Sequence, residues 1–140
     1  MKLSTRVRYG IRAMAELAKH PRGRAVSLHE VAKAQGISPK YLEQMATMLK
    51  IAGLVESVRG SEGGYRLARP GSEINLWEIY SALDASCQII DCLTSGCERK
   101  NHCGIRGLWG ELNESIADVL RSHTIQEIAR RELAMEKAKA

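Results

Sequence analysis

The chain has 140 residues and a formal net charge of +5, a size that suits one ordinary domain and excludes two large ones. No apolar run approaches the roughly 18–20 residues that cross a bilayer, and the first ten residues lack the apolar stretch of a signal peptide, so we expect a cytoplasmic protein with no membrane partner. The charge is uneven, because residues 1–70 carry 13 Lys and Arg against 5 Asp and Glu (+8), whereas residues 71–140 carry 8 against 11 (−3). This predicts a polyanion-binding module over residues 1–70 and a different unit over residues 71–140, although a solvated charged face would produce the same asymmetry.

Three helices are predicted in the first half. Residues 4–20 carry apolar side chains at helical spacing behind Ser4, which is positioned to cap the first turn. The apolar positions are Val7, Ile11, Met14, Ala15 and Ala18. Ser27 and Glu30 have the spacing of a reciprocal capping box, which predicts a short second helix that Gly36 ends. Ser38 followed by a proline is typical of a helix start, so a third helix begins almost at once.

A β-hairpin is predicted after the third helix. Residues 54–60 (LVESVRG) and 65–69 (YRLAR) indicate two short strands around a glycine-rich turn, with Arg59 at the tip. Two helices joined by a tight glycine turn and followed by a hairpin form a winged helix-turn-helix, so we expect a mainly α fold with a small β-hairpin. On the basic half of the chain, this fold indicates binding to a double-stranded DNA operator; the alternative is a protein-docking or purely structural use of the same shape.

The third helix carries polar side chains suited to base edges. The candidate DNA-contacting residues at its start are Ser38, Lys40, Tyr41, Glu43 and Gln44. Gln can bond adenine through two hydrogen bonds, Glu can accept one from cytosine, and Lys can reach guanine or phosphate. Tyr41 could equally be buried in the helix pair, and we expect Leu42 to be in the core. Four basic residues near the amino terminus either contact phosphates or are merely solvated: Lys2, Arg6, Arg8 and Arg12.

The second half is predicted to be helical around a cysteine-containing loop. Asn75 and Glu78 have capping-box spacing at the start of one helix, and Thr124 and Glu127 have it at the start of the last, which then loses its apolar stripe and should fray. Between them, residues 105–122 carry apolar residues spaced as in a coiled-coil seam: Ile105, Leu108, Leu112, Ile116 and Val119. This stripe could pack on the core, but it favours a long C-terminal dimerisation helix and a homodimer, which would supply two recognition helices for a palindromic site.

Three cysteines lie close together in the stretch CLTSGCERKNHC. Cys92, Cys97 and Cys103 are separated by four and five residues, without the C-x-x-C pairs that are typical of zinc sites. Clustered thiols in a reducing compartment indicate metal binding or redox sensing, and soft thiolates on one loop suit an iron–sulfur cluster. Thiol oxidation without a cluster is the alternative. We expect Cys87, at or just past a helix end, to be a small buried residue.

The motifs GISPKYLEQ and GLVESVRGSEGGYRLAR, with the downstream cysteine loop, resemble the IscR/NsrR family of bacterial winged-helix regulators, over nearly the whole chain. The resemblance implies a dimeric transcription factor, not an enzyme, with an iron–sulfur cluster (two-iron two-sulfur or four-iron four-sulfur) beside the dimer helix. It implies base recognition by Glu43 and Gln44 and entry of Arg59 into the minor groove, and it makes Cys92, Cys97 and Cys103 the expected cluster ligands. Some relatives lack the cysteines and act without a cluster.

The fourth cluster ligand does not carry over from the family. Where two-iron members have a histidine three residues after the last cysteine, this chain has Arg106, and where some four-iron relatives use a residue near the partner subunit's amino terminus, it has Arg8. The local candidates are His102, Cys87, Asp91 and Glu98, with a partner-chain residue as a further alternative.

Overall fold

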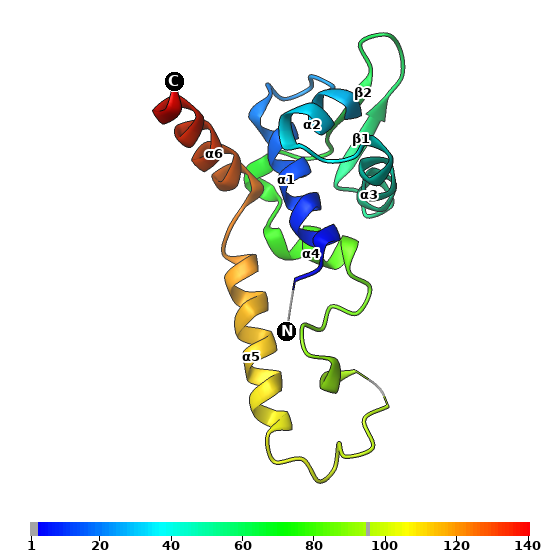
Figure 1. Ribbon diagram of the computed structural model, residues 1–140, viewed down its shortest axis with the longest axis vertical. Coiled ribbons are helices and arrows are strands. Elements are labelled where there is room, and N and C mark those ends of the chain that lie inside the picture. Colours follow the sequence, from blue (N-terminus) through cyan, green and yellow to red (C-terminus); the bar gives the residue numbers. More distant parts are fainter. Residues whose placement is uncertain (1–2, 95) are drawn as a thin grey trace.

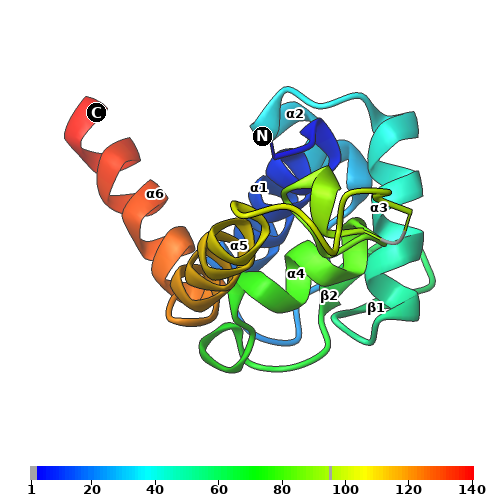
Figure 2. The same ribbon diagram turned by 90° about the horizontal axis from the view of Figure 1, so that it is seen from below.

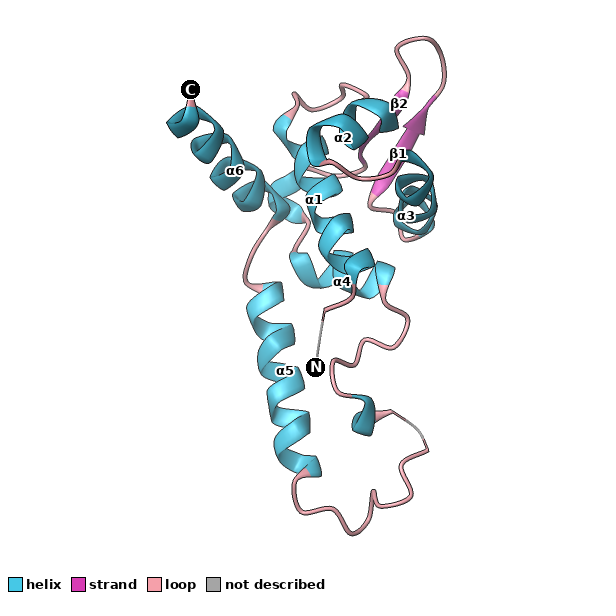
Figure 3. Cartoon of the chain, in the orientation of Figure 1, coloured by secondary structure: helices cyan, strands magenta, loops and turns pink. Residues whose placement is uncertain are grey.

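The structure, a computed structural model, describes residues 3–94 and 96–140. In chain order its elements are α1 (Thr5–Lys19), α2 (Leu28–Gln35), α3 (Pro39–Ile51), β1 (Val55–Val58), β2 (Gly64–Leu67), the 3-10 helix η1 (Gly71–Glu73), α4 (Leu76–Leu83), the 3-10 helix η2 (Asp91–Leu93), α5 (Arg106–Arg121) and α6 (Ile125–Lys139). Helices dominate and the described strands form one antiparallel hairpin (Figure 3). The predicted fold class, a winged helix-turn-helix followed by a long helix, is confirmed.

The helix starts follow the predicted capping signals. The Ser4 hydroxyl accepts a hydrogen bond from the Val7 amide, and the capping box between Ser27 and Glu30 is complete. Gly36 ends α2 in the left-handed conformation, with φ of 64°. These local interactions satisfy backbone groups that a helix end leaves unpaired, so they fix where the helix-turn-helix begins and turns.

The hairpin is joined to the helices through Val26. β1 and β2 pair in register from Val55 opposite Leu67 to Val58 opposite Gly64. Val26 and Tyr65 exchange two backbone hydrogen bonds of 2.8 Å, which add the α1–α2 loop to the edge of β2. Gly64 has φ of 148°, and a Cβ there would lie 2.3 Å from the Val26 carbonyl oxygen, so only glycine permits this close approach.

The core surrounds α1. Val7, Met14 and Ala15 are fully buried and pack among side chains from α2, α3, α4 and the hairpin. Gly10 lets α4 approach α1 closely, because a Cβ at this position would lie 2.0 Å from Leu83 Cδ1. Figure 1 shows α1 between α3 and the hairpin on one side and α6 on the other.

A pair of backbone hydrogen bonds, which we call the clasp, closes the second half onto itself. The Leu76 amide donates to the His123 carbonyl at 3.0 Å, and the Ile125 amide donates to the Ile74 carbonyl at 2.9 Å. Between these points the chain runs out through α4 and the cysteine loop and returns through α5. Figure 2 views α5 nearly along its axis, with the loop beside it and α6 pointing away.

The last helix does not fray as expected. α6 continues to Lys139, since Ile125 and Ala129 are fully buried and the ammonium of Lys19 on α1 reaches its acidic side. Lys19 Nζ lies 2.9 Å from Glu132 and 2.6 Å from Glu136. The apolar stripe is short, but ion pairs between α1 and α6 extend the contact beyond it. None of the helices in the described ranges is both long and apolar enough to span a membrane.

Candidate DNA-binding surface and cysteine loop

The exposed face of α3 presents polar side chains in one row. Lys40, Glu43 and Gln44 are all exposed, and they fall on one face of the helix because they are three and four positions apart. Ser38 caps this helix, since its hydroxyl accepts a hydrogen bond from the Tyr41 amide at 3.3 Å. Leu42 is buried, as predicted. The row is therefore available to a partner, while the opposite face of α3 holds the helix in the core.

Tyr41 lies between these two faces. It is half-buried, and its ring meets the Tyr9 ring edge-on, with centroids 6.1 Å apart and an interplanar angle of 81°. The ring thus helps to join α3 to α1, and its predicted contact with a base stays a prediction.

Arg59 is exposed in the turn between β1 and β2, beyond the end of the strand pairing. It lies in the hairpin turn that Figure 1 shows projecting from the helices. Its guanidinium has no ion pair or hydrogen bond with any described residue, so it is free for a partner outside the chain.

The amino-terminal arginines differ from one another. Arg12 donates to the backbone carbonyl and, at 3.1 Å, to the side-chain oxygen of Gln35, and it lies 5.3 Å from the Tyr9 ring centroid. It therefore braces the turn between α2 and α3 rather than pointing at solvent. Arg8 is exposed and contacts only Thr5 on its own helix, so it remains a candidate phosphate contact. Lys2 lies outside the described residues.

The cysteine loop is built from successive turns. Asp91–Leu93 form η2, and further turns are closed by backbone hydrogen bonds from the Lys100 amide to the Cys97 carbonyl and from the Arg106 amide to the Cys103 carbonyl. All the cysteines are free thiols; Cys92 is exposed, and Cys97 and Cys103 are partly exposed. Thiols on such a loop can reach a metal or an oxidant.

The described ligating side chains do not converge in this arrangement. Within residues 3–94 and 96–140, no three His, Cys, Asp or Glu side chains lie close enough together to hold a metal ion. Three of the fourth-ligand candidates, His102, Asp91 and Glu98, are exposed. Cys87 is half-buried, packs against the core and has a positive φ of 49°, which sets it apart from the three loop thiols.

Two contacts that sequence patterns did not indicate join the loop to α5. The Arg106 guanidinium donates to the Cys92 carbonyl at 2.5 Å. The side-chain oxygen of Asn113, the one buried polar residue of the described ranges, accepts a hydrogen bond from the Ile89 amide at 2.9 Å. Periodicity could not reveal either, although a lone Asn on the apolar side of a helix is the kind of signal that marks a buried polar contact.

The base of the loop contains a buried tyrosine. Burial of Tyr80, together with the nearby charge of Asp84, raises the pKa of its phenol to about 12. Its ring stacks on Trp77, with centroids 5.0 Å apart. The phenol stays protonated at neutral pH, so it does not add to the charge around the cysteines.

α5 has a buried face and an exposed apolar face. Asn113 and Ala117 are buried against the chain's own core, and Ile116 and Leu120 pack beside them. Part of the predicted seam is left exposed: Ile105 by 45%, Leu108 by 54% and Val119 by 59%. This side of the helix has no covering partner among the described residues.

A family model described as an iron-dependent transcriptional regulator, Rrf2, matches residues 3–131. The chain belongs to the Rrf2 family. An HTH-type transcriptional regulator IscR of Xenorhabdus nematophila is 36% identical over 139 residues, covering 99% of this chain and 85% of that protein. Among solved structures, T. potens IscR has a TM-score of 0.78 at 36% identity, over 94% of this chain and 88% of that chain. The oxidized form of Staphylococcus aureus CymR has a TM-score of 0.74 at 34% identity, over 92% and 96% of the two chains.

These similarities confirm the predicted resemblance. This Rrf2-family chain is a DNA-binding transcriptional regulator, and its relatives are regulators rather than enzymes. The winged-helix arrangement and the exposed row on α3 are the parts of the structure that suit this activity.

Proposed function

We propose that this chain acts as a homodimer whose binding to a DNA operator is controlled by an iron–sulfur cluster on the cysteine loop. The observation that carries the proposal is the direct connection of that loop to α5 through Arg106 and Asn113. Residues 1–70 would contact DNA and residues 71–140 would sense the signal. A cytoplasmic location follows from DNA as the partner.

DNA contact would use the two exposed features of the basic half. Ser38, Lys40, Tyr41, Glu43 and Gln44 would lie at the start of a recognition helix in the major groove, where Glu and Gln distinguish cytosine and adenine. Arg59 would enter an adjacent minor groove, where narrow A·T tracts concentrate negative potential.

The loop residues fit a cluster by donor chemistry. Cys92, Cys97 and Cys103 would supply soft thiolate donors, which iron–sulfur clusters require. Because the side chains do not converge as described, the loop would have to close for these residues to share a cluster. When bound, the cluster would supply a redox- and ligand-sensitive centre, and Arg106 would hold the Cys92 backbone against α5.

Dimerisation would use the exposed apolar side of α5. Ile105, Leu108 and Val119 are too large and too exposed to suit a helix that stays in water. A second copy of α5 would cover them and would place two recognition helices on one operator. Sedimentation of the parent and of Leu108→Glu tests this, with Met135→Glu, at an exposed apolar position of α6, as the control. A monomeric parent would contradict it.

The test of the sensor begins with anaerobically purified protein and its four single Cys→Ala variants. We expect charge-transfer absorption above about 300 nm, with iron and sulfide, in the parent and in Cys87→Ala. Variants at positions 92, 97 and 103 should lose it or hold iron only weakly. If Cys87→Ala loses its iron while one of the other three keeps a full complement, the ligand assignment is wrong.

Thiol oxidation is a second candidate switch. It is favoured by the free, partly exposed loop thiols, which do not converge on a metal position in the described residues. A CymR relative has been solved in an oxidized form. Colourless protein whose operator affinity changes on peroxide treatment, and returns on reduction, would support this switch and overturn the cluster.

The contact with DNA is tested by salt and by one substitution. Affinity should fall steeply with salt, because a +8 half neutralises several phosphates and releases their counterions. Gln44→Ala should cost about 1–3 kcal/mol on the operator and relax specificity at one base pair. Gln88→Ala makes the same chemical change outside the winged helix and is the control. Equal losses of Gln44→Ala on operator and random DNA would show that Gln44 does not contact bases.

A further inference from the structure

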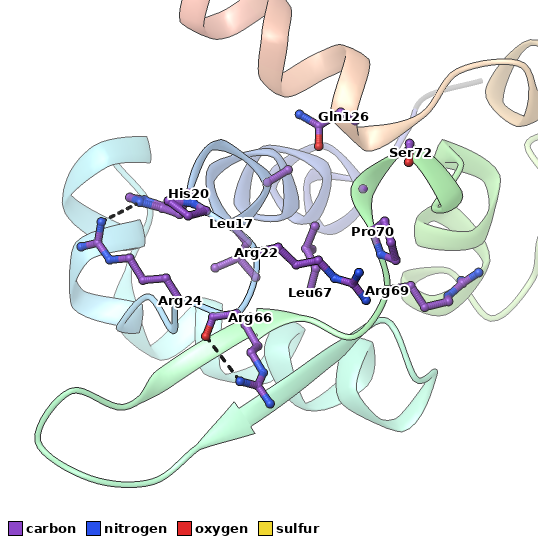
Figure 4. Close-up of a pocket in the computed structure, with 14 residues that line it drawn as sticks. Leu17, His20, Arg22, Arg24, Arg66, Leu67, Arg69, Pro70, Ser72 and Gln126 are labelled. Atoms are coloured by element: carbon purple, nitrogen blue, oxygen red, sulfur yellow. Dashed lines mark hydrogen bonds between the residues drawn. The ribbon is translucent and has the colours of Figure 1, made fainter.

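A cavity of about 130 Å³ lies where the two halves of the chain meet. The end of α1, the α1–α2 loop, the end of β2, η1 and the first turn of α6 line it (Figure 4). No residue of α3 and none of residues 59–63 is among its lining residues. The proposed DNA-contacting side chains are therefore not part of it.

The lining is strongly basic. Four of the fourteen lining residues are arginines, one is His20, and none is Asp or Glu. The arginines are Arg22, Arg24, Arg66 and Arg69. A concave site with one sign of charge concentrates ions of the opposite sign.

Three of these arginines form ion pairs with glutamates that do not line the cavity. Arg24, Arg66 and Arg69 pair with Glu30, Glu56 and Glu78 at 3.4, 3.1 and 2.6 Å. These pairs are half-exposed, so each contributes little stability. Each also has a second partner: Arg24 bonds the His20 ring, Arg66 donates to the Gly23 carbonyl and Arg69 donates to the Glu73 carbonyl. Their charges are thus largely engaged, and only part of their five N–H donors is left for a ligand.

Arg22 has no such partner. It is exposed and makes no ion pair or hydrogen bond with any described residue. Figure 4 shows its side chain extending from the α1–α2 loop toward Pro70 and Arg69. Arg69 is paired with Glu78, so Arg22 is the arginine of this lining whose charge and donors are left open to an anion.

The volume limits the size of the occupant. Cavities for drug-sized ligands span roughly 300–1,000 Å³, whereas one of about 150 Å³ holds benzene, which has six heavy atoms. At about 130 Å³ this cavity suits an anion of five or six heavy atoms. Leu17, Leu67 and Pro70 supply an apolar wall that strengthens charge-assisted hydrogen bonds on the other side.

We propose that this cavity binds a small oxyanion, either orthophosphate or a short carboxylate, with Arg22 as its principal ligand. Arg22 comes from the DNA-contacting half, and Ser72 and Gln126 come from the other half. A bound anion therefore contacts both halves and stabilises the packing of α6 against them. The site is separate from the cysteine loop, so it adds an input that does not depend on a cluster.

The test is a titration of the full chain with orthophosphate, followed by phosphorus-31 NMR, at ionic strength held constant with chloride. We expect saturable binding and slower amide hydrogen exchange at residues 71–73 and 125–128. Arg22→Gln should weaken binding at least tenfold, and Ser72→Asp, which replaces a hydroxyl of the lining by a carboxylate that repels an anion, should do the same. Arg130→Gln removes one exposed arginine of α6 outside the cavity and should bind phosphate like the parent.

Competition identifies the source of the oxyanion. Displacement of phosphate by pyruvate would support a short carboxylate as the ligand, and retention of phosphate would support phosphate. Equal displacement by chloride, or unchanged binding by both cavity variants, would overturn the proposal. It would also be overturned if the parent binds no phosphate and Arg22→Gln weakens binding to DNA, because the arginines would then serve the duplex.

Discussion

Replacing Asn113 by alanine should loosen the cysteine loop from α5. Its side-chain oxygen accepts a hydrogen bond from the Ile89 amide at 2.9 Å, and both residues are buried. The substitution removes a bond with a net value of about 0.5–1.5 kcal/mol and leaves a buried N–H unpaired, which costs about 1–3 kcal/mol. We therefore expect a loss of about 2 kcal/mol in the free energy of unfolding. At this chain length that lowers Tm by roughly 6–8 °C.

The assay combines thermal unfolding with hydrogen exchange at the Ile89 amide. If exchange follows global unfolding, 2 kcal/mol corresponds to exchange about 30-fold faster. Asn113→Leu keeps the branched shape and the four heavy atoms of the side chain but removes the acceptor, which separates the hydrogen bond from the cavity that alanine leaves. Asn101→Ala, an exposed asparagine of the same loop, is the control and should match the parent. Unchanged Ile89 exchange in both Asn113 variants would refute the reasoning.

Four further outcomes can be measured. Gly10→Ala should lower the free energy of unfolding, measured in urea, by about 1 kcal/mol. Overpacking against Leu83 costs about 1–3 kcal/mol, and the higher helix propensity of alanine offsets part of that cost. A more stable variant would show that α4 shifts freely. Lys19→Met should speed hydrogen exchange throughout α6, with exposed Lys137→Met as the control. Equal exchange in the two variants would show that Lys19 does not hold α6 against α1. Burial alone would raise the pKa of Glu16, but hydrogen bonds from Gln35 and Lys19 lower it below 4.5. The ionised Glu16 therefore stabilises the fold at neutral pH, and this stabilisation is lost as pH falls below 4.5. In Glu16→Gln the free energy of unfolding should depend less on pH in that range. Arg59→Ala should weaken DNA binding most on operators with A·T-rich flanks, and losses that ignore the flanks would assign Arg59 to a phosphate.

The fold was predictable where short-range signals decide it. The capping boxes at Ser27, Asn75 and Thr124 are all present, and the hairpin forms around the predicted turn. Each depends on residues within a few positions of one another, so the sequence shows both partners together. The same holds for the exposed row on α3, because helical spacing alone puts its members on one face.

Contacts between distant residues were not predictable. Arg12 was left open between a phosphate contact and a solvated side chain, and it instead binds Gln35, 23 positions away. The continuation of α6 depends on Lys19, which lies more than a hundred residues upstream of its partners. The arginine-lined cavity likewise gathers residues from both halves, and nothing in their spacing indicates that they meet.

The proposed ligand set of the cysteine loop was predictable only in part. Sequence spacing grouped Cys92, Cys97 and Cys103 and set Cys87 apart, and the structure keeps Cys87 against the core. Which side chain would complete the proposed cluster depends on how the loop would close, and a bound group rather than local propensity would select that conformation.

The clasp between Ile74 and Ile125 closes the segment between them into a loop whose two ends are held together by backbone hydrogen bonds. The ends of a closed loop stay together whatever its length, and doubling a flexible length costs only about 0.6 kcal/mol of extra closure entropy. Residues can thus be inserted or deleted between α4 and α5 while the helix-turn-helix keeps its geometry. A loop with a different length or spacing of side chains could therefore be grafted onto the same clasp, which makes this chain a suitable scaffold for engineered regulators.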